Sequence, residues 1–313
     1  MKKALLAVLA CLLTCGTARA QFQEAEPGGP RLGEPATSKW QAGLVVRAGN
    51  GACRGIIGTA AVPIDWPEQQ VIVVDEEITP TAKMSYRAVG ATAKLMVVSI
   101  PVLQPREEGR ALVTLEVRRS PQLPPEDTSG HTVAPERKLE RSVRPYLGPS
   151  PQIENRHPRI QKLARELASS GHKGWEHVAA IFDWVRNNVK KTTGKNVGAA
   201  AAIATGQGTH EDIASAFIAL CRASGIPART VWVPAYCYAE FYLLDAEGKG
   251  HWFPADVAGN AELGASIETR PILFKGDNYR PPHDDNDIQR FPAEYLTGKG
   301  GSPDYDFVRK LVD

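Results

Sequence analysis

The stretch GTHEDIASAFIALCRASGIPAR, residues 208–229, decides the fold of the second half of the chain. Thr209 is a favourable N-cap, and Asp212 three residues later completes a variant of the capping box, so a helix is predicted to begin at His210. The apolar residues of this helix recur at helical spacing and form one buried stripe: Ile213, Phe217, Leu220 and Cys221. The sequence Gly-Ile-Pro then ends the helix, because proline cannot continue it.

The segments on either side of this helix predict an α+β domain. Two amphipathic helices are expected before it, over residues 157–170 and 174–189. After it come TVWV (230–233), YCYAEFYLL (236–244) and HWFPAD (251–256), which have the alternation of strands. Helices followed by consecutive strands are typical of an antiparallel sheet with helices packed on it.

The first half of the chain has a different texture. Short runs rich in β-branched residues occur at 43–48, 70–77, 94–101 and 111–119, separated by turn residues. This spacing predicts an antiparallel β-sandwich of six or seven strands. Residues 120–155 are rich in proline and polar side chains, which favours a linker.

The first twenty residues have the features of a secretory signal peptide. Lys2 and Lys3 precede an apolar stretch too short to span a bilayer, and Ala18-Arg19-Ala20 fits the small-x-small cleavage rule. A lipid anchor through Cys15 is disfavoured, because Thr14 is a poor residue before a lipidated cysteine. We therefore expect an exported protein, periplasmic or extracellular, whose mature chain begins at Gln21.

The sequence thus predicts six parts. They are a signal peptide (1–20), a flexible lead (21–38), a β-sandwich domain (39–119), a proline-rich linker (120–155), an α+β domain (156–297) and a C-terminal tail (298–313).

Composition excludes several functions. The formal net charge is +2, with 42% hydrophobic and 23% charged residues, which gives no reason to expect a nucleic-acid partner. Only Cys53, Cys221 and Cys237 follow the signal peptide, and this odd number does not form a disulfide framework. The acidic run at 283–287 lacks the loop glycine and terminal glutamate of a calcium loop. No metal and no cofactor are expected.

From the residues alone, His210 is weak evidence for a functional site. A histidine in the first turn of a helix is held neutral by the helix dipole, and a capped helix start with a surface histidine is the simpler interpretation. In the strand 236–244, alternation places Tyr236, Tyr238, Glu240 and Tyr242 on one face and Cys237 on the apolar face. Asp256 is available to orient a group on the neighbouring strand, although a solvated carboxylate near a turn is the simpler interpretation.

Residues 157–295 resemble the bacterial transglutaminase-like superfamily, whose fold is related to papain-type thiol proteases. The motifs that carry the resemblance are FDWVRNNV (182–189), the stretch 208–229, YCYAEFYL (236–243) and HWFPAD (251–256). The resemblance implies a nucleophilic cysteine at the helix start, a histidine base in the next motif and an orienting aspartate in the last. In this sequence those positions are His210, Tyr236 and Asp256.

Two of the three catalytic positions are therefore substituted. Imidazole opposite a phenol does not reproduce a thiolate and its base, so the resemblance implies that thiol catalysis is absent. Cys221 lies eleven residues further along the helix and Cys237 faces the core, so neither is a substitute.

Two functions remain open at this stage. The first is an exported, non-catalytic module that binds peptide, protein or cell-wall material or serves in envelope architecture. The second is a divergent hydrolase or transferase that uses His210 with Tyr236 and Asp256. In either case four residues are expected to line the cleft, although core packing is as simple for the tryptophans: Trp232, Tyr238, Glu240 and Trp252. The sequence does not predict an oligomeric state.

Overall fold

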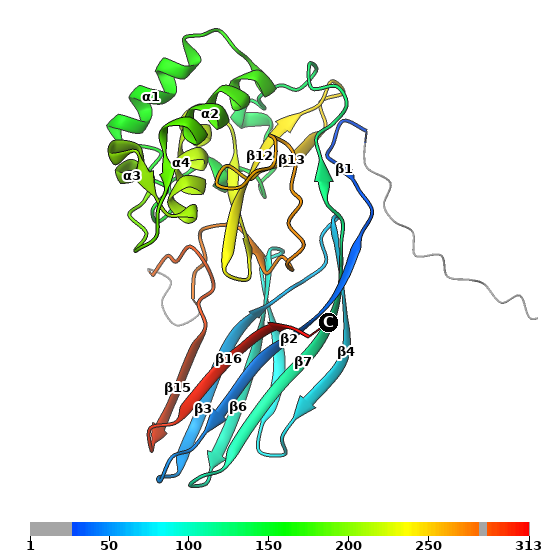
Figure 1. Cartoon of the computed structure of the whole chain (residues 1–313), viewed down its shortest axis with the longest axis vertical. Coiled ribbons are helices and arrows are strands. Elements are labelled where there is room, and N and C mark those ends of the chain that lie inside the picture. Colours follow the sequence, from blue (N-terminus) through cyan, green and yellow to red (C-terminus); the bar gives the residue numbers. More distant parts are fainter. Residues whose placement is uncertain (1–26, 282–286, 313) are drawn as a thin grey trace, which may run out of the picture.

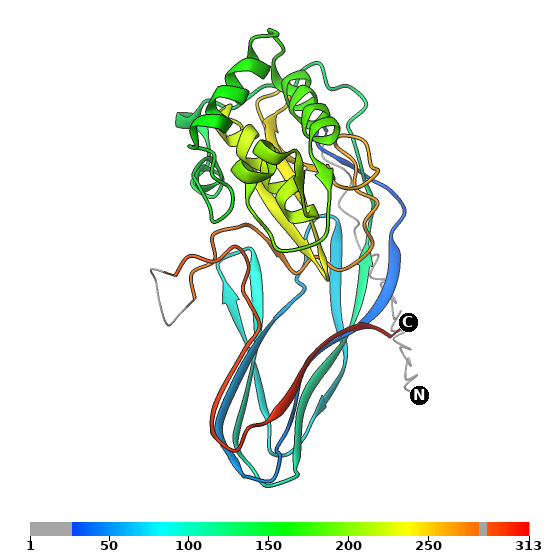
Figure 2. The same ribbon diagram turned by 60° about the vertical axis from the view of Figure 1, so that its left-hand side comes forward.

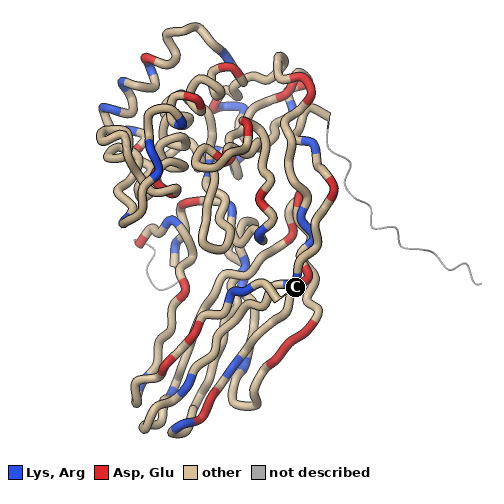
Figure 3. The backbone as a smooth tube through the Cα atoms, in the orientation of Figure 1, with Lys and Arg blue, Asp and Glu red and all other residues tan. Residues whose placement is uncertain are grey.

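The computed structural model describes residues 27–281 and 287–312. The predicted signal peptide, residues 21–26 of the lead and most of the acidic run at 283–287 lie outside these ranges. The described chain is elongated, with the helices and the strands β12 and β13 at one end and a β-sandwich at the other (Figure 1). Figure 3 shows basic and acidic residues interspersed along both ends. No helix in the described ranges is both long and apolar enough to cross a membrane.

The sandwich consists of two antiparallel sheets. The first has the order β16-β2-β7-β4, and the second contains β15-β3-β6 with β5 paired to β6. The bounds of these strands are β2 Ala36–Arg47, β3 Cys53–Val62, β4 Gln69–Ile78, β5 Lys83–Val89, β6 Ala93–Leu103, β7 Glu108–Arg119, β15 Tyr295–Gly300 and β16 Asp304–Leu311. Alternate residues of both sheets, such as Leu44, Met96 and Val113, fill the core between them.

The end of the chain belongs to this sandwich. All eight residues of β16 pair with β2, and β15 pairs with β3. Leu296 and Phe307 pack against the sandwich core. The segment expected to be a tail, residues 298–313, therefore contains the end of β15 and the whole of β16. The alternation of polar and apolar residues in β16 is interrupted at Phe307-Val308 and at Arg309-Lys310, so the sequence of this segment alone does not indicate a strand.

The helical domain is built around α4, His210–Ala223, which lies against the sheet of β11 (Ala228–Val233), β12 (Tyr236–Leu244) and β13 (Gly250–Ala255). The helices α1 (Pro158–Ala168), α2 (Gly174–Asn188) and α3 (Ala199–Thr205) pack on α4. Figure 2 shows the helices together on one face of these strands. The two helices predicted before α4 are confirmed, whereas α3, an alanine-rich segment of seven residues, was not predicted.

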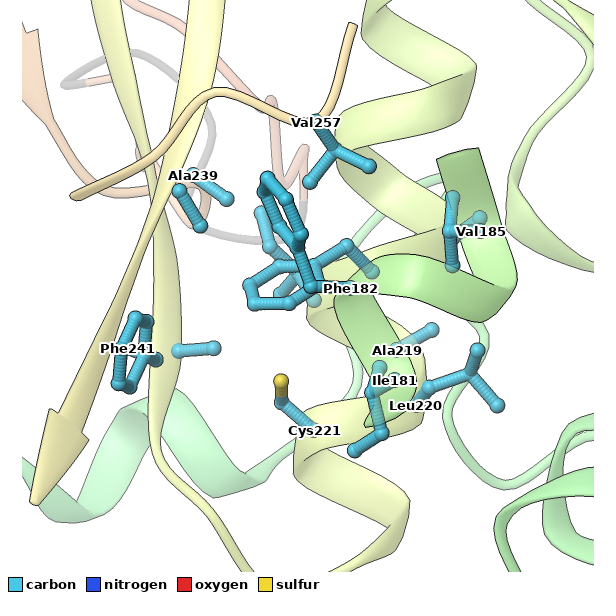
Figure 4. Close-up of a cluster of buried hydrophobic side chains, with 14 of the residues drawn as sticks. Ile181, Phe182, Val185, Ala219, Leu220, Cys221, Ala239, Phe241 and Val257 are labelled. Atoms are coloured by element: carbon cyan, nitrogen blue, oxygen red, sulfur yellow. The ribbon is translucent and has the colours of Figure 1, made fainter. Parts of the chain in front are cut away.

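The core of the helical domain lies between α4 and β12. Ala239 and Phe241 of β12 belong to one buried cluster with Phe182, Ala219 and Cys221 (Figure 4). Every residue of α4 from Asp212 to Arg222 is buried, because α1–α3 cover the sides of α4 that the sheet leaves free. The predicted stripe is therefore part of a helix that is buried on all sides.

One sheet continues from the sandwich into the helical domain. The strand β14, Phe274–Lys275, pairs with β11 on one side and with β6 of the sandwich on the other. The remaining elements of two to four residues are β1 Arg31–Leu32, β8 Gln122–Leu123, the 3-10 helices Glu136–Lys138 and Arg144–Leu147, β9 Lys190–Lys191 and β10 Gln207–Gly208.

The segment 120–155 alternates between exposed residues and residues packed against both halves of the chain. Its strand β8 pairs with β1, so residues of the expected flexible lead form a strand as well. Thr132 exchanges two backbone hydrogen bonds with Leu244 of β12. Several of its side chains are buried, including His131, Ala134, Leu139, Val143 and Ile153.

Limited trypsin digestion tests whether the two halves are independent units, as the composition of 120–155 predicts. Arg137, Lys138 and Arg141 are exposed, so cleavage is expected there. We expect the nicked chain to elute as one particle and to unfold in one transition, because β16 and β15 hold the C-terminal fragment in the sandwich. Two fragments that separate without denaturant would instead establish independent domains.

Candidate functional site

The start of α4 is fixed by a complete capping box. The Thr209 hydroxyl accepts a hydrogen bond from the Asp212 backbone N–H at 3.2 Å, and Asp212 Oδ2 accepts one from the Thr209 N–H at 2.9 Å. Asp212 Oδ1 also accepts from the backbone N–H groups of Val197 and Gly198, each at 2.8 Å. These bonds hold His210 as the first residue of the helix, as the sequence predicted.

Tyr236 lies opposite His210 in the candidate site. A two-residue turn, Pro234–Ala235, joins β11 to β12, and Ala235 has the left-handed φ of 58°. Tyr236 is therefore the first residue of β12, and its ring lies over that of His210 with centroids 4.9 Å apart and planes 28° apart. The two rings stack, and no hydrogen bond between their side chains occurs in the described structure.

The phenol of Tyr236 is hydrogen-bonded to Asp256 instead. Tyr236 Oη donates to Asp256 Oδ1 at 2.6 Å, and the backbone N–H of Gly259 donates to the backbone oxygen of Asp256. The structure thus brings His210, Tyr236 and Asp256 together in that order. Because the phenolic O–H donates to the carboxylate, its proton is not available for a hydrogen bond to the imidazole.

The surroundings keep the two rings uncharged. Burial lowers the pKa of His210, and the charges of Lys191 and Arg270 lower it further. Burial and the hydrogen bond to Asp256 raise the pKa of Tyr236 far above its ordinary value. Burial also raises the pKa of the Asp256 carboxyl, with Glu268 adding to the effect. At neutral pH the stacked pair is therefore a neutral imidazole and a neutral phenol.

Two cations beside the stacked pair were not singled out in the sequence. The Lys191 ammonium lies 5.8 Å from the centre of the Tyr236 ring, and the Arg270 guanidinium lies 5.1 Å from it. Arg270 is held by Glu268 and donates to the Pro234 oxygen at 2.9 Å. Arg270 opens the sequence RPILFKGDNYR, and only the folded chain brings that segment back to the site.

The thiols lie away from this trio. Cys53, Cys221 and Cys237 are all free and buried. Burial raises the pKa of the Cys221 and Cys237 thiols, which makes the reactive thiolate inaccessible at neutral pH. The sequence-based interpretation of Cys237 as a core residue is confirmed, since its side chain packs with Trp232 and Ala214.

The four residues expected to line the cleft do not share one surface. Trp232 lies near the helix start, where its ring packs against Phe291 and the Arg290 guanidinium. The other three lie on the face of the sheet away from α4. Tyr238 accepts a hydrogen bond from Arg119. Glu240 and Trp252 both contact Arg229. Among the residues described, no group of His, Cys, Asp and Glu has the arrangement of a metal site.

Comparison with known proteins identifies the domain that contains the trio. Residues 161–257 match the model of the transglutaminase-like superfamily. The solved structure of a candidate cysteine protease from Cytophaga hutchinsonii has a TM-score of 0.61 at 19% identity, covering 91% of this chain and 93% of that one. The similarity in fold to that structure therefore extends over both halves of this chain. The TgpA periplasmic domain from Pseudomonas aeruginosa aligns at 17% identity with a TM-score of 0.32, over 69% of this chain and 87% of that one. No curated protein sequence matches.

Proposed function

Because residues 161–257 form a transglutaminase-like domain, we propose that this domain is a binding module of an exported protein and that it performs no thiol chemistry. His210 occupies the nucleophile position and Tyr236 the base position. The function of such a site is recognition of peptide, protein or cell-wall material rather than its cleavage.

The observation that carries the proposal is the direction of the Tyr236 hydroxyl. A working triad needs an unbroken chain of hydrogen bonds from the orienting acid through the base to the nucleophile. Here the hydroxyl donates to Asp256 at 2.6 Å, and the imidazole lies against the face of the phenol ring rather than at its oxygen. The geometry supports a fixed surface of two neutral rings beside the Asp256 carboxylate rather than a catalytic triad.

The chemistry around the trio favours a ligand with a carboxylate. Lys191 is exposed and Arg270 is half-buried, and both lie beside Tyr236. The imidazole of His210 is half-buried and makes no side-chain hydrogen bond to the described residues, so it can donate one to a ligand. Peptide chain ends and the peptide parts of cell-wall polymers carry carboxylates, which cations and N–H donors bind together.

The second candidate function is a divergent hydrolase or transferase. It is favoured by one observation, the proximity of a neutral imidazole to a phenol and a carboxylate. In this mechanism His210 would act as the general base, since its lowered pKa keeps it unprotonated near neutral pH.

Thiol alkylation combined with an activity screen separates the two functions. In the native chain beginning at Gln21 we expect the three thiols to react with iodoacetamide at least roughly 100-fold more slowly than in denaturant, because all three are buried. We also expect no amidase or transamidase activity above background. Activity that survives alkylation and disappears in His210→Ala would establish the hydrolase and overturn the binding proposal.

A further inference from the structure

A second site lies on the face of the sheet away from α4. A cavity of about 380 Å³ is bounded by four parts of the chain: the segment 29–32, the sandwich loop that carries Trp66 and Glu68, Gln122 of β8, and the sheet residues Glu240, Trp252 and Lys275. Its volume is within the range of small-molecule sites, roughly 300–1,000 Å³. It shares no lining residue with the stacked pair and does not depend on the function proposed for that pair.

Four buried charges form one chain in the wall of this cavity. Lys275 Nζ lies 2.6 Å from Glu68 Oε1 and 2.5 Å from Glu240 Oε1, and Arg229 donates to Glu240 Oε2 at 2.9 Å. Two carboxylates and two cations balance, so the wall carries no net charge. An ionic ligand would find no opposite charge that is not already paired, and a neutral polar ligand is favoured.

Two indole rings add flat apolar surface to the same cavity. Trp66 and Trp252 are both only half-buried. The Lys275 ammonium lies 4.8 Å from the centre of the Trp66 ring, and the Arg229 guanidinium lies 4.0 Å from that of Trp252. Each ring is thus held by a cation, and a ligand with a flat apolar face has aromatic surface available for contact.

The cavity wall also holds one unpaired donor and one unpaired acceptor. Trp66 Nε1 and Gln122 Oε1 are buried, and neither has a hydrogen-bond partner among the described residues. Both residues line the cavity. Buried polar atoms are usually satisfied in folded proteins. Because both atoms are covered by their neighbours, each side chain must rotate before a ligand in the cavity can pair with it. A hydroxyl group can satisfy either atom, because it both donates and accepts.

We propose that this cavity binds a neutral saccharide. A sugar ring combines the three properties that the cavity requires: no net charge, hydroxyl groups that donate and accept, and an apolar face that packs on indole. The residues expected to contact the sugar are Trp66, Gln122 and Trp252, while the Glu68–Lys275–Glu240–Arg229 chain holds them in place.

Indole N–H signals in a ¹⁵N–¹H NMR spectrum test the proposal on the native protein, which has six tryptophans. The probes are glucose, N-acetylglucosamine and their β-1,4-linked tetrasaccharides, with glucuronic acid and glucosamine as charged comparators. We expect at least one neutral probe to shift the Trp66 signal saturably. The Trp40 signal should remain unchanged, because that indole lies in the sandwich and donates to Ser38.

Two conservative variants then test the named contacts. Trp66→Phe keeps an aromatic ring but removes the donor, and Gln122→Leu removes the acceptor. Each should weaken binding roughly 2- to 10-fold, the effect of one hydrogen bond. The matched control Trp40→Phe should leave the dissociation constant unchanged. The proposal is overturned if no neutral probe gives a saturable shift, if a charged comparator binds more tightly, or if both variants bind as the native protein does. Gln122→Leu supplies the test if Trp66→Phe does not fold.

Discussion

Lys275→Met is expected to destabilise the protein by about 3–5 kcal/mol, because it leaves the buried Glu68 carboxylate without its cation and leaves Glu240 with Arg229 alone. Lys275 is the central member of the buried charge chain and bonds both Glu68 and Glu240. Its side chain is 3% exposed and that of Glu240 is fully buried. For a chain of this length the loss corresponds to a decrease in melting temperature of roughly 6–20 °C, measured by calorimetry.

The matched control is Lys162→Met, which removes an exposed lysine that pairs with Glu166 at 3.7 Å. That variant should change the free energy of unfolding by no more than about 0.5 kcal/mol, since exposed ion pairs contribute little. The double variant Lys275→Met with Glu68→Gln should lose less than the sum of its single changes, because Lys275→Met leaves Glu68 unpaired and Glu68→Gln removes that charge. Equal effects of Lys275→Met and Lys162→Met would show that the buried chain does not stabilise the fold.

The pH dependence of stability provides a second measurement on the same chain. Burial alone would raise the pKa of Glu240, but the charges of Lys275 and Arg229 outweigh it and hold the pKa below the ordinary value. The unfolded state therefore binds more protons than the folded state just below the unfolded pKa of about 4.3. The stabilisation by ionised Glu240 should be fully present above pH 5 and should decline as the pH falls. The difference in the free energy of unfolding between the native protein and Glu240→Gln, measured by urea unfolding, should therefore become smaller as the pH falls.

Local signals made much of the fold predictable. The start of α4 was predicted because Thr209 and Asp212 are three residues apart, and this spacing alone specifies the capping box. The strands β2, β6 and β7 were predicted because their apolar residues lie in runs that only a sheet core can bury. The C-terminal strand β16 was not predicted, since its stability comes from pairing with β2, more than 250 residues earlier.

The candidate site was predictable only in part. The family resemblance named His210, Tyr236 and Asp256 as one site, and these three side chains lie together in the structure. Alternation also grouped Tyr238 and Glu240 with Tyr236. A two-residue period indicates only which residues share a face of the strand, and it does not indicate which face meets the helix. Tyr236 reaches α4 because it is the first residue of β12, whereas the later residues of that set contact the sandwich side. The stacking of the rings, in place of a hydrogen bond, depends on that placement and has no signal in the sequence.

The double variant His210→Cys with Tyr236→His is expected to place a reactive thiolate at the start of α4. The new thiol would stand at the first position of α4, beside Lys191 and Arg270, and would face an imidazole in place of the phenol. A helix N-terminus, nearby cations and a histidine partner all favour the thiolate. Its pKa should therefore fall at least about one unit below the ordinary 8.5 for cysteine.

Iodoacetamide labelling across a pH series, with mass spectrometry of the labelled peptide, measures that pKa directly. At pH 6.5 the new thiol should react at least roughly 100-fold faster than Cys221 or Cys237, which are buried. The control His210→Cys with Tyr236→Phe has the same thiol without its imidazole partner, and its thiol pKa should be higher. Asp256 remains in both variants and can hold the new imidazole as it now holds the phenol. Turnover is not required, because oxyanion donors matched to a substrate are a separate part of catalysis. A thiol that titrates near 8.5 in both variants would mean that the positions of His210 and Tyr236 no longer have the geometry of a nucleophile and its base.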